Sequence, residues 1–574
     1  MTRKGLLPRA LLCLGMVVPL YACRANISDP QLRNRGGAAG VLGAAGASGA
    51  AGAGTGPSGA PGSQELAKQR CATSNVGPPM LRRLTQQEFQ HTVSDIFPQI
   101  VSTWSGVKIG TDAVSSLGFS NDAATLVVGQ QTAQEILSTA EDVATHVIDD
   151  SVLPAILPCA TSAADATCAA QFISQYGARL FRRPLSADET KRYGDYFTSV
   201  SGASSFKLGI KWTLVALFQS ANAVYRSELG VANGGQYALT QNEIATELGY
   251  NFGGSTPSAD LLAKAAAGAL ATPDARLAEA RNLLTTANGK EVVRELFREW
   301  SGYAVVQART KTNTAFTGMA NDMTSETQQF IDDVVFTHNG TLSDLLTAPY
   351  TFLNANLATY YGYGTQSAAF ARVDRPANWG IGLLAQGSLL AANAHADATS
   401  PTWRGLLVFQ KMFCNTKPKP PPSVPSIAAP SPGVTTTRQR YETSHIANPS
   451  CSACHTRWDP IGFAFEHFDE IGRYRANEGG LTIDTTGYVL DESGNKTLTF
   501  DGATDLATQL AGDPAVTDCV SGLMSEYVYA GGGGVGCLAE TARTALAKGQ
   551  FGLLEYLAQL STERQFSERA LPSP

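Results

Sequence analysis

The chain has 574 residues, of which 43% are apolar, and its formal net charge at pH 7 is −6. This length and apolar content are sufficient for several hydrophobic cores and predict about three or four domains. The charge is small for the length, and no stretch interleaves basic with aromatic residues, so the composition argues against a nucleic-acid partner.

The N-terminal residues have the features of a bacterial export signal. Arg3 and Lys4 precede a mostly apolar run over residues 6–20, which is too short for a spanning helix. Residues 20–23 (LYAC) then resemble a lipobox, in which Cys23 becomes the lipidated first residue of the mature protein. The alternative is an ordinary secretory signal that is cleaved nearby. Both predict export, and the lipobox predicts an anchor in the cell envelope, periplasmic or at the outer membrane or cell surface, as the chain's sole membrane contact.

The segment after the signal is predicted to be a flexible tether. Residues 36–62 are almost entirely Gly, Ala and Ser with two Pro. Such a composition cannot bury enough apolar surface to fold. A lipid at Cys23 followed by this segment would hold the folded part of the chain away from the membrane surface.

The folded part, from about Pro78, is predicted to be mainly α-helical. Capping boxes, in which a Thr is followed three residues later by a Glu, occur at Thr85 with Glu88, Thr132 with Glu135 and Thr240 with Glu243. Apolar residues at helical spacing predict helices over residues 132–149, 172–181, 207–225, 240–250, 281–300 and 324–335. A small β-hairpin is expected within 483–501, where turn residues gather.

Cys451, Cys454 and His455 form a C-x-x-C-H motif, which is typical of a c-type haem attachment site. Two thiols three positions apart on an incipient helix can each bond one vinyl group of a porphyrin, and the adjoining imidazole becomes the proximal iron ligand. The alternative is a disulfide or a thioredoxin-like redox pair, which is expected near a βαβ pattern that this sequence lacks. The motif therefore predicts one covalent haem c.

The residues on either side of the motif predict the secondary structure that surrounds it. A proline-rich tract at 417–432 should run extended and deliver the chain into a short helix at 435–447. After the motif, Asp459 is predicted to be the N-cap of a helix that begins at Pro460 and ends at Gly472. The apolar face of that helix would form one wall of the haem site.

The sixth iron position decides between two classes of function. A side chain in that position predicts electron transfer, whereas an open position allows peroxide or oxygen chemistry. The candidate distal ligands are His445, His395 and Met524, and a position without a protein ligand is the alternative. His445 is the first candidate, because it precedes Cys451 by six residues and the closing loop is short.

Six further cysteines of the exported chain can form up to three disulfides, which persist outside the cytoplasm. They are Cys71, Cys159, Cys168, Cys414, Cys519 and Cys537. Local spacing favours Cys159 with Cys168 and Cys519 with Cys537. Free buried thiols are the alternative.

Several motifs together resemble one known set of domains. Residues 449–455 (PSCSACH), 459–466 (DPIGFAFE) and 468–475 (FDEIGRYR), with Thr399-Ser400-Pro401, Arg404-Gly405 and Cys414 upstream, are similar to the planctomycete-type cytochrome domain. Residues 81–85 (LRRLT), 181–185 (FRRPL) and 350–354 (YTFLN) resemble its usual partner domains, whose function is unknown, and residues from Phe500 onward resemble its C-terminal partner. The resemblance implies a haem protein and does not specify a reaction.

Three functions are consistent with these observations. The first is an exported, lipid-anchored c-type cytochrome that transfers electrons to or from a redox partner protein, with the helical domains docking a co-exported protein. The second is a haem-dependent oxidoreductase that uses peroxide or oxygen on a substrate outside the cytoplasm. The third is a binding or scaffold protein in which the haem is structural.

The predicted domains follow from these motifs and composition changes. They are a lipoprotein signal peptide (1–23), the tether (24–63), an N-terminal helical domain (78–150), a small helical domain with Cys159 and Cys168 (155–204), a central helical domain (205–364), the cytochrome c-like haem-binding domain (376–478) and a C-terminal helical domain (482–568).

Overall fold

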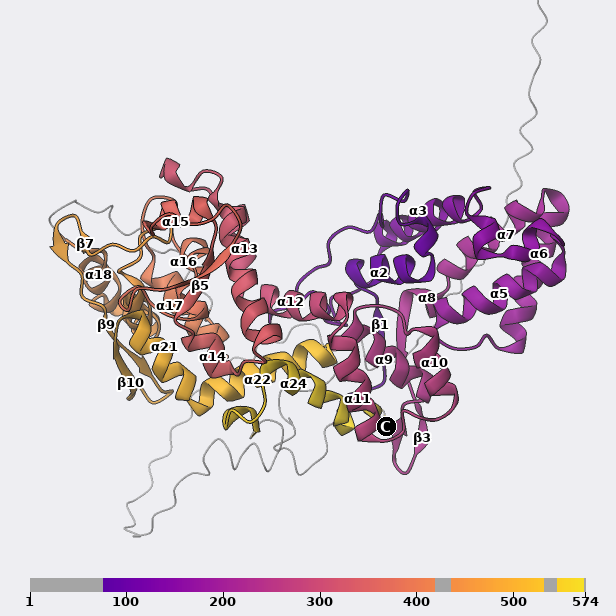
Figure 1. The fold of residues 1–574 in the computed structure, drawn as a ribbon. Coiled ribbons are helices and arrows are strands. Elements are labelled where there is room, and N and C mark those ends of the chain that lie inside the picture. The colour runs from indigo at the N-terminus through magenta and orange to yellow at the C-terminus, as the bar shows by residue number, and fades with distance from the viewer. Residues whose placement is uncertain (1–75, 419–434, 531–544, 572–574) are drawn as a thin grey trace, which may run out of the picture. The chain divides into compact units, whose positions relative to one another are not determined.

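The computed structural model describes residues 76–418, 435–530 and 545–571. Within these ranges the chain is mainly α-helical, and its strands form only two- and three-stranded sheets (Figure 1). The fold class predicted from the sequence is therefore confirmed. The predicted signal peptide and tether, Cys23, Cys71, Cys537 and most of the proline tract lie outside the described residues. In the described ranges, no helix combines the length and the apolar character needed to cross a bilayer.

The first part of the described chain packs helices around an aromatic core. Phe97 stacks on Tyr176 with ring centroids 5.1 Å apart, and Phe172 lies 4.8 Å from the same tyrosine. Strands β1 and β2 pair antiparallel and bring Met80 opposite Glu228. The elements are β1 (Met80–Arg83), α2 (Gln86–Ile96), α3 (Gln130–Val147), α4 (Leu153–Ile156), α5 (Ala166–Phe181), α6 (Ala187–Ala203), α7 (Phe206–Phe218), α8 (Ala221–Val224) and β2 (Tyr225–Glu228).

Two predictions for this part need correction. Helix α3 begins at Gln130 with Gly129 as N-cap, so Thr132 and Glu135 form no capping box. The Glu135 carboxylate accepts hydrogen bonds from the Gly110 N–H and the Gln131 side chain instead. The helix predicted over 207–225 ends at Phe218, because the Ser220 side chain caps a separate short helix and Tyr225 opens strand β2. The capping box at Thr85 is confirmed.

The central part continues the helical pattern. The Thr240 capping box is confirmed at the start of α9. The helix predicted over 281–300 is broken after Leu284, because the Thr286 side chain caps a new helix by accepting from the Gly289 N–H. The elements are β3 (Val231–Asn233), β4 (Gln236–Ala238), α9 (Gln241–Gly253), α10 (Ala259–Ala266), α11 (Pro273–Leu284), α12 (Ala287–Ser301), α13 (Met319–Asp332), α14 (Leu342–Thr347), β5 (Tyr350–Leu353) and α15 (Ala355–Tyr361).

The remaining part carries the C-x-x-C-H motif. The hairpin predicted within 483–501 is present as strands β9 and β10. Strand β11 pairs with β4 and extends the β3–β4 hairpin to three strands. The elements are β6 (Ala371–Asp374), α16 (Gly387–Ala392), α17 (Pro401–Lys411), α18 (Thr437–Tyr441), α19 (Pro449–His455), α20 (Asp459–Gly462), β7 (Asn477–Glu478), β8 (Leu481–Thr482), β9 (Thr486–Leu490), β10 (Lys496–Asp501), α21 (Gly502–Gly512), α22 (Pro514–Tyr529), α24 (Leu553–Gln559), α25 (Arg564–Ser567) and β11 (Glu568–Ala570).

Two disulfides join described cysteines. Cys159 and Cys168 are bonded, as their spacing predicted. Cys519 is bonded to Cys414, 105 residues away, with Cα atoms 5.4 Å apart. The predicted Cys519–Cys537 pairing is therefore wrong in this structure. Helix α22 brings Cys519 to the chain just after α17, a proximity that spacing along the sequence does not indicate.

A buried ion network ties the first strand pair to the C-terminal strand. The Glu228 carboxylate, 1% exposed, accepts hydrogen bonds from Arg82 Nε at 2.7 Å and Arg569 Nε at 3.0 Å. Burial by itself raises the pKa of Glu228, but the guanidiniums of Arg82, Arg569 and Arg226 lower this pKa to about 2. The carboxylate is therefore ionised and is the shared counter-charge of two buried cations.

Replacing this carboxylate by a neutral amide should strongly destabilise the fold. We expect Glu228→Gln to lower the free energy of unfolding by about 3–5 kcal/mol, because it removes the counter-charge of the buried Arg569 and leaves the buried Arg82 with Glu247 alone. Guanidinium chloride unfolding followed by circular dichroism measures the change. Asp195→Asn is the control, since the Lys191–Asp195 pair is largely exposed and its loss should cost less than about 1 kcal/mol. Equal unfolding midpoints for the two variants would contradict the prediction.

Candidate functional site

Helix α19 presents both cysteines of the motif and ends at the histidine. The Asn448 side chain caps it by accepting from the Ser450 N–H, and Pro449 occupies the first turn. Cys451 and Cys454 are three residues apart, so their thiols lie on neighbouring positions of one helix face. Both are free and partly buried. The structure therefore contains no Cys451–Cys454 disulfide.

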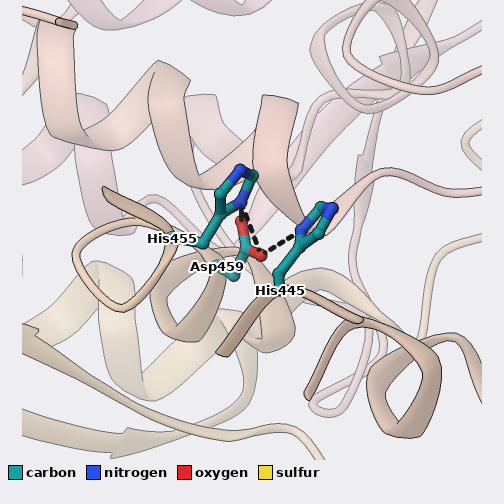
Figure 2. A group of neighbouring side chains, drawn as sticks. All are labelled: His445, His455 and Asp459. Carbon is teal, nitrogen blue, oxygen red and sulfur yellow. Dashed lines mark hydrogen bonds and ion pairs between the residues drawn. The ribbon is translucent and has the colours of Figure 1, made fainter. Parts of the chain in front are cut away.

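The Asp459 carboxylate binds two imidazoles at once (Figure 2). Nδ1 of His455 lies 3.0 Å from Oδ2 and 3.1 Å from Oδ1 of Asp459, and Nδ1 of His445 lies 2.8 Å from Oδ2. The aspartate side chain is completely buried, whereas the side chains of His445 and His455 are 11% and 19% exposed. Since a carboxylate accepts hydrogen bonds, each imidazole is oriented with its Nδ1–H towards Asp459 and its Nε2 directed away.

A close helix–helix contact holds the aspartate in place. Helices α17 and α20 meet at Gly405 and Gly462, where an added Cβ would stand 1.8 Å from the Trp458 and Pro401 carbonyl oxygens, respectively. This approach places Thr402 of α17 beside Asp459 of α20, and the threonine hydroxyl donates to Oδ1 at 2.6 Å. Burial raises the pKa of Asp459, but hydrogen bonds from His445, His455 and Thr402 outweigh it and lower this pKa below its usual value.

The predicted capping role of Asp459 is wrong. Trp458 is the N-cap of α20, Asp459 is the first residue of the helix, and α20 ends at Gly462 instead of continuing to Gly472. A short 3-10 turn (Phe463–Phe465) follows it. The carboxylate is committed to the two imidazoles and Thr402, so it is unavailable to cap backbone N–H groups.

His445 lies beside His455 rather than facing it. It belongs to a π-helical turn (Glu442–Ile446) that follows α18, a geometry often found at functional sites. The two imidazole centroids are 3.8 Å apart, and Tyr441 packs edge-on against His445 at 4.8 Å. Both rings approach the same carboxylate through Nδ1. This arrangement accounts for the conformation of His445 without a bond to a metal.

The other candidate ligands lie in different surroundings. The His395 ring packs on Trp403 with centroids 4.5 Å apart, and its Nε2 lies 3.4 Å from the Tyr441 hydroxyl. Burial lowers the pKa of His395, which favours the neutral imidazole. Met524 lies on α22 and is 2% exposed within the largest hydrophobic cluster. The structure brings His445, His455 and Asp459 into one group and leaves His395 and Met524 outside it.

The donor groups at α19 fit a covalently attached haem. Two free thiols lie on one helix face, and the adjoining imidazole uses Nδ1 for Asp459. Within the described part of the chain, no protein group hydrogen-bonds to Nε2 of His455, so this nitrogen is available to a metal. The buried indole N–H of Trp458, 5.5 Å from His455 between ring centroids, also has no hydrogen-bond partner among the described residues.

Sequence reasoning identified the three residues of the motif but missed the role of Asp459 and Thr402. The signal for Asp459 was its spacing, because residues four apart along a helical turn lie on one face and Asp459 follows His455 by four. Thr402 gave no such signal, since it reaches the site from α17, 57 residues upstream.

Four family models match the chain. They are PSD3, a protein of unknown function (DUF1587), at residues 82–149; PSD5, a protein of unknown function (DUF1595), at 168–228; PSD4, a protein of unknown function (DUF1592), at 239–363; and PSCyt3, a protein of unknown function (DUF1588), at 381–478. These four matches end at residue 478, so the resemblance from Phe500 onward stays a prediction. No curated protein and no solved structure matches the chain.

Along the chain, each matched model covers one of the motifs that resembled this set of domains in the sequence. The PSCyt3 match contains Cys451, Cys454, His455 and Asp459. The chain therefore belongs to the planctomycete cytochrome-like multi-domain family.

Proposed function

We propose that the protein is an exported c-type haem protein that transfers electrons. The observation that carries the proposal is the group of two free thiols and one imidazole at α19, with that imidazole held by the buried Asp459 carboxylate. A redox pair of cysteines would need no histidine oriented in this way. When bound, a haem would supply a one-electron couple.

The chain's own residues have distinct roles in this proposal. Cys451 and Cys454 hold the macrocycle by thioether bonds, and His455 offers Nε2 to the iron. Asp459 accepts the Nδ1–H of His455, which fixes the tautomer and ring orientation and makes the imidazole a stronger electron donor. Thr402 donates to the same carboxylate and keeps it in place.

Three side chains are candidates for the sixth iron ligand, and the alternative is a position that none of the three fills. His445 would have to leave its position beside His455, because its ring packs on that imidazole and its Nδ1 is bound to the same Asp459 carboxylate. His395 and Met524 would have to approach the iron from their own clusters. The comparison of His445→Ala, His395→Ala and Met524→Ala identifies the ligand. Only the variant that lacks the true ligand should change a low-spin haem into a high-spin one.

A haem-dependent oxidoreductase is the second candidate function, and the Asp459–His455 hydrogen bond favours it. A carboxylate on the distant nitrogen of the proximal imidazole raises the basicity of the ligand. A haem held by a more strongly donating imidazole would be suited to supply peroxide or oxygen chemistry. Peroxide or oxygen would be the oxidant, and the substrate would lie outside the cytoplasm.

Absorption spectra of the protein made in a host with c-type haem maturation test both functions. We expect a haem that acid–acetone does not extract. A low-spin spectrum that carbon monoxide leaves unchanged supports electron transfer, and a high-spin spectrum that responds to carbon monoxide or peroxide supports the oxidoreductase. A haem-free protein with a Cys451–Cys454 disulfide would overturn both.

Removing the negative charge next to the proximal imidazole should raise the reduction potential. We expect Asp459→Asn to raise it by about 60–120 mV, which corresponds to a ten- to hundredfold loss in the preference for ferric over ferrous iron. Potentiometric titration of the purified protein measures the change. Asp469→Asn is the control, because Asp469 lies in the same region but pairs with Arg473. An unchanged potential in Asp459→Asn would show that the carboxylate does not act on the iron ligand.

We also propose that the protein is lipid-anchored through Cys23 and exchanges electrons with a protein partner in the cell envelope. The lipobox-like residues 20–23 and the Gly/Ala/Ser-rich segment after them support this localisation. Metabolic labelling with a fatty acid should mark the wild-type protein and not Cys23→Ala. An unlabelled, released wild-type protein would point to an ordinary secretory signal.

A further inference from the structure

A cavity of about 340 Å³ opens beside Trp403, and neither Cys451 nor Cys454 belongs to its lining. Its walls come from residues 301–309, after α12, and from residues 392–411, around α16 and α17. The lining includes Arg309, Asn393, Trp403, Leu406, Leu407 and Lys411. A mixture of apolar side chains with a few polar and charged ones, in a cavity of this size, is typical of small-molecule sites.

The charge around this cavity is positive. The Arg309 guanidinium lies 5.6 Å over the Trp403 ring, and its Nε donates to the Ala392 carbonyl oxygen. Lys411 donates to the Leu117 carbonyl oxygen, and Lys311 donates to those of Ala394 and His395. Among the described residues none of these three cations forms an ion pair, although more distant carboxylates act on two of them: Glu299 on Lys411, and Glu470 and Asp469 on Lys311. An anionic ligand in the cavity would therefore be the first direct ion-pair partner of Arg309 and Lys411.

A row of rings connects the cavity to the haem site. The Trp403 ring packs on His395 at 4.5 Å, and His395 Nε2 lies 3.4 Å from the Tyr441 hydroxyl. The ring centroids of Tyr441 and His445 are 4.8 Å apart, and those of His445 and His455 are 3.8 Å apart. Trp403 is thus the member of this row that borders the cavity, and His455 is the member that adjoins the thiols.

We propose that the Trp403 cavity binds an anionic aromatic redox molecule of the quinol or quinone class, with its negative group at Arg309 and Lys411 and its ring near Trp403. The redox role of the bound molecule rests on the proposed haem function, whereas its binding to the cavity does not require haem. In the reducing direction a bound quinol would give one electron to a ferric haem held at α19 and release one hydroxyl proton to the solvent, and no bond of the protein would be made or broken.

Calorimetric titration of the wild-type protein with anthraquinone-2,6-disulfonate tests the binding. We expect Arg309→Gln and Lys411→Gln each to weaken it about tenfold, the effect of losing one charge-assisted contact. Arg473→Gln is the matched control, because Arg473 also lies over an aromatic ring, that of Tyr360 at 5.8 Å, and should bind like the wild type. Uncharged 2-hydroxymethylanthraquinone should bind the wild type more weakly. Equal binding of the charged and uncharged probes would overturn the proposal without any variant.

A second measurement tests the row of rings. With the reduced probe, haem reduction in Trp403→Phe should be slower than in Trp379→Phe, a tryptophan that packs on Tyr474 outside the row. Equal rates in the two variants would remove Trp403 from the path. Haem content, measured on the same preparations, separates the two proposals. Binding by a haem-free wild type would leave the cavity assignment standing and overturn the haem function, whereas a haem-loaded protein that binds no probe would overturn the cavity assignment alone.

Discussion

The Cys451→Ala/Cys454→Ala protein is expected to carry no covalent haem, whereas the wild type made in the same host carries one haem c. The loss should be complete, because the two thiols are the proposed attachment atoms and α19 offers no others. Haem staining of denaturing gels and the pyridine haemochrome spectrum measure it. His455→Ala should retain the thioether bonds but hold the iron poorly, since Nε2 of that imidazole is the proposed ligand.

The control for this loss is Cys159→Ala/Cys168→Ala. That pair also consists of two nearby cysteines, but it forms a disulfide in the structure. It should keep its haem. Equal haem in the Cys451→Ala/Cys454→Ala protein and the wild type would overturn the assignment of α19 as the attachment site.

Removal of the Cys414–Cys519 disulfide is expected to lower the free energy of unfolding by about 4–5 kcal/mol in the chain-entropy description. The reason is that this disulfide closes a loop of about 100 residues and so restricts the unfolded chain. The sequence separation of the two cysteines is 105. Cys414→Ser/Cys519→Ser should therefore unfold at a clearly lower guanidinium chloride concentration than the wild type.

The other disulfide supplies a control of the same chemistry. Cys159 and Cys168 are separated by only 9 residues, so Cys159→Ser/Cys168→Ser should cost less than about 3 kcal/mol. Under a reductant strong enough to open both bonds, the wild type and the Cys414→Ser/Cys519→Ser protein should unfold at the same midpoint. A larger loss from the short loop than from the long one would contradict the entropic explanation.

Features determined by neighbours in the sequence were predicted well. The capping boxes at Thr85 and Thr240 and the hairpin of β9 and β10 depend on residues a few positions apart, and they are present. The box at Thr132 failed because Gly129 could start the helix one turn earlier. The C-x-x-C-H motif belongs to the same local class, since its chemistry lies within five consecutive residues.

Features that depend on residues far apart in the sequence could not be predicted from local patterns. The Asp459 side chain binds His445, fourteen residues upstream, and Thr402 from another helix. The partner of Cys519 lies 105 residues away, whereas spacing favoured the nearer Cys537. The cavity beside Trp403 has walls from two stretches about ninety residues apart, which a pattern of helices along the chain cannot bring together.

The pairing of β11 with β4 has a consequence for secretion. If the chain is exported as proposed, it would leave a translocation pore from its N-terminal side, and β4 would emerge long before its partner. Arg569, in β11, lies 341 residues after Glu228, which it binds. Until then one edge of the β3–β4 hairpin remains open to pairing with other chains. A periplasmic holdase that shields this edge, or slow release from the pore, would thus influence the yield of folded protein before any cofactor is attached.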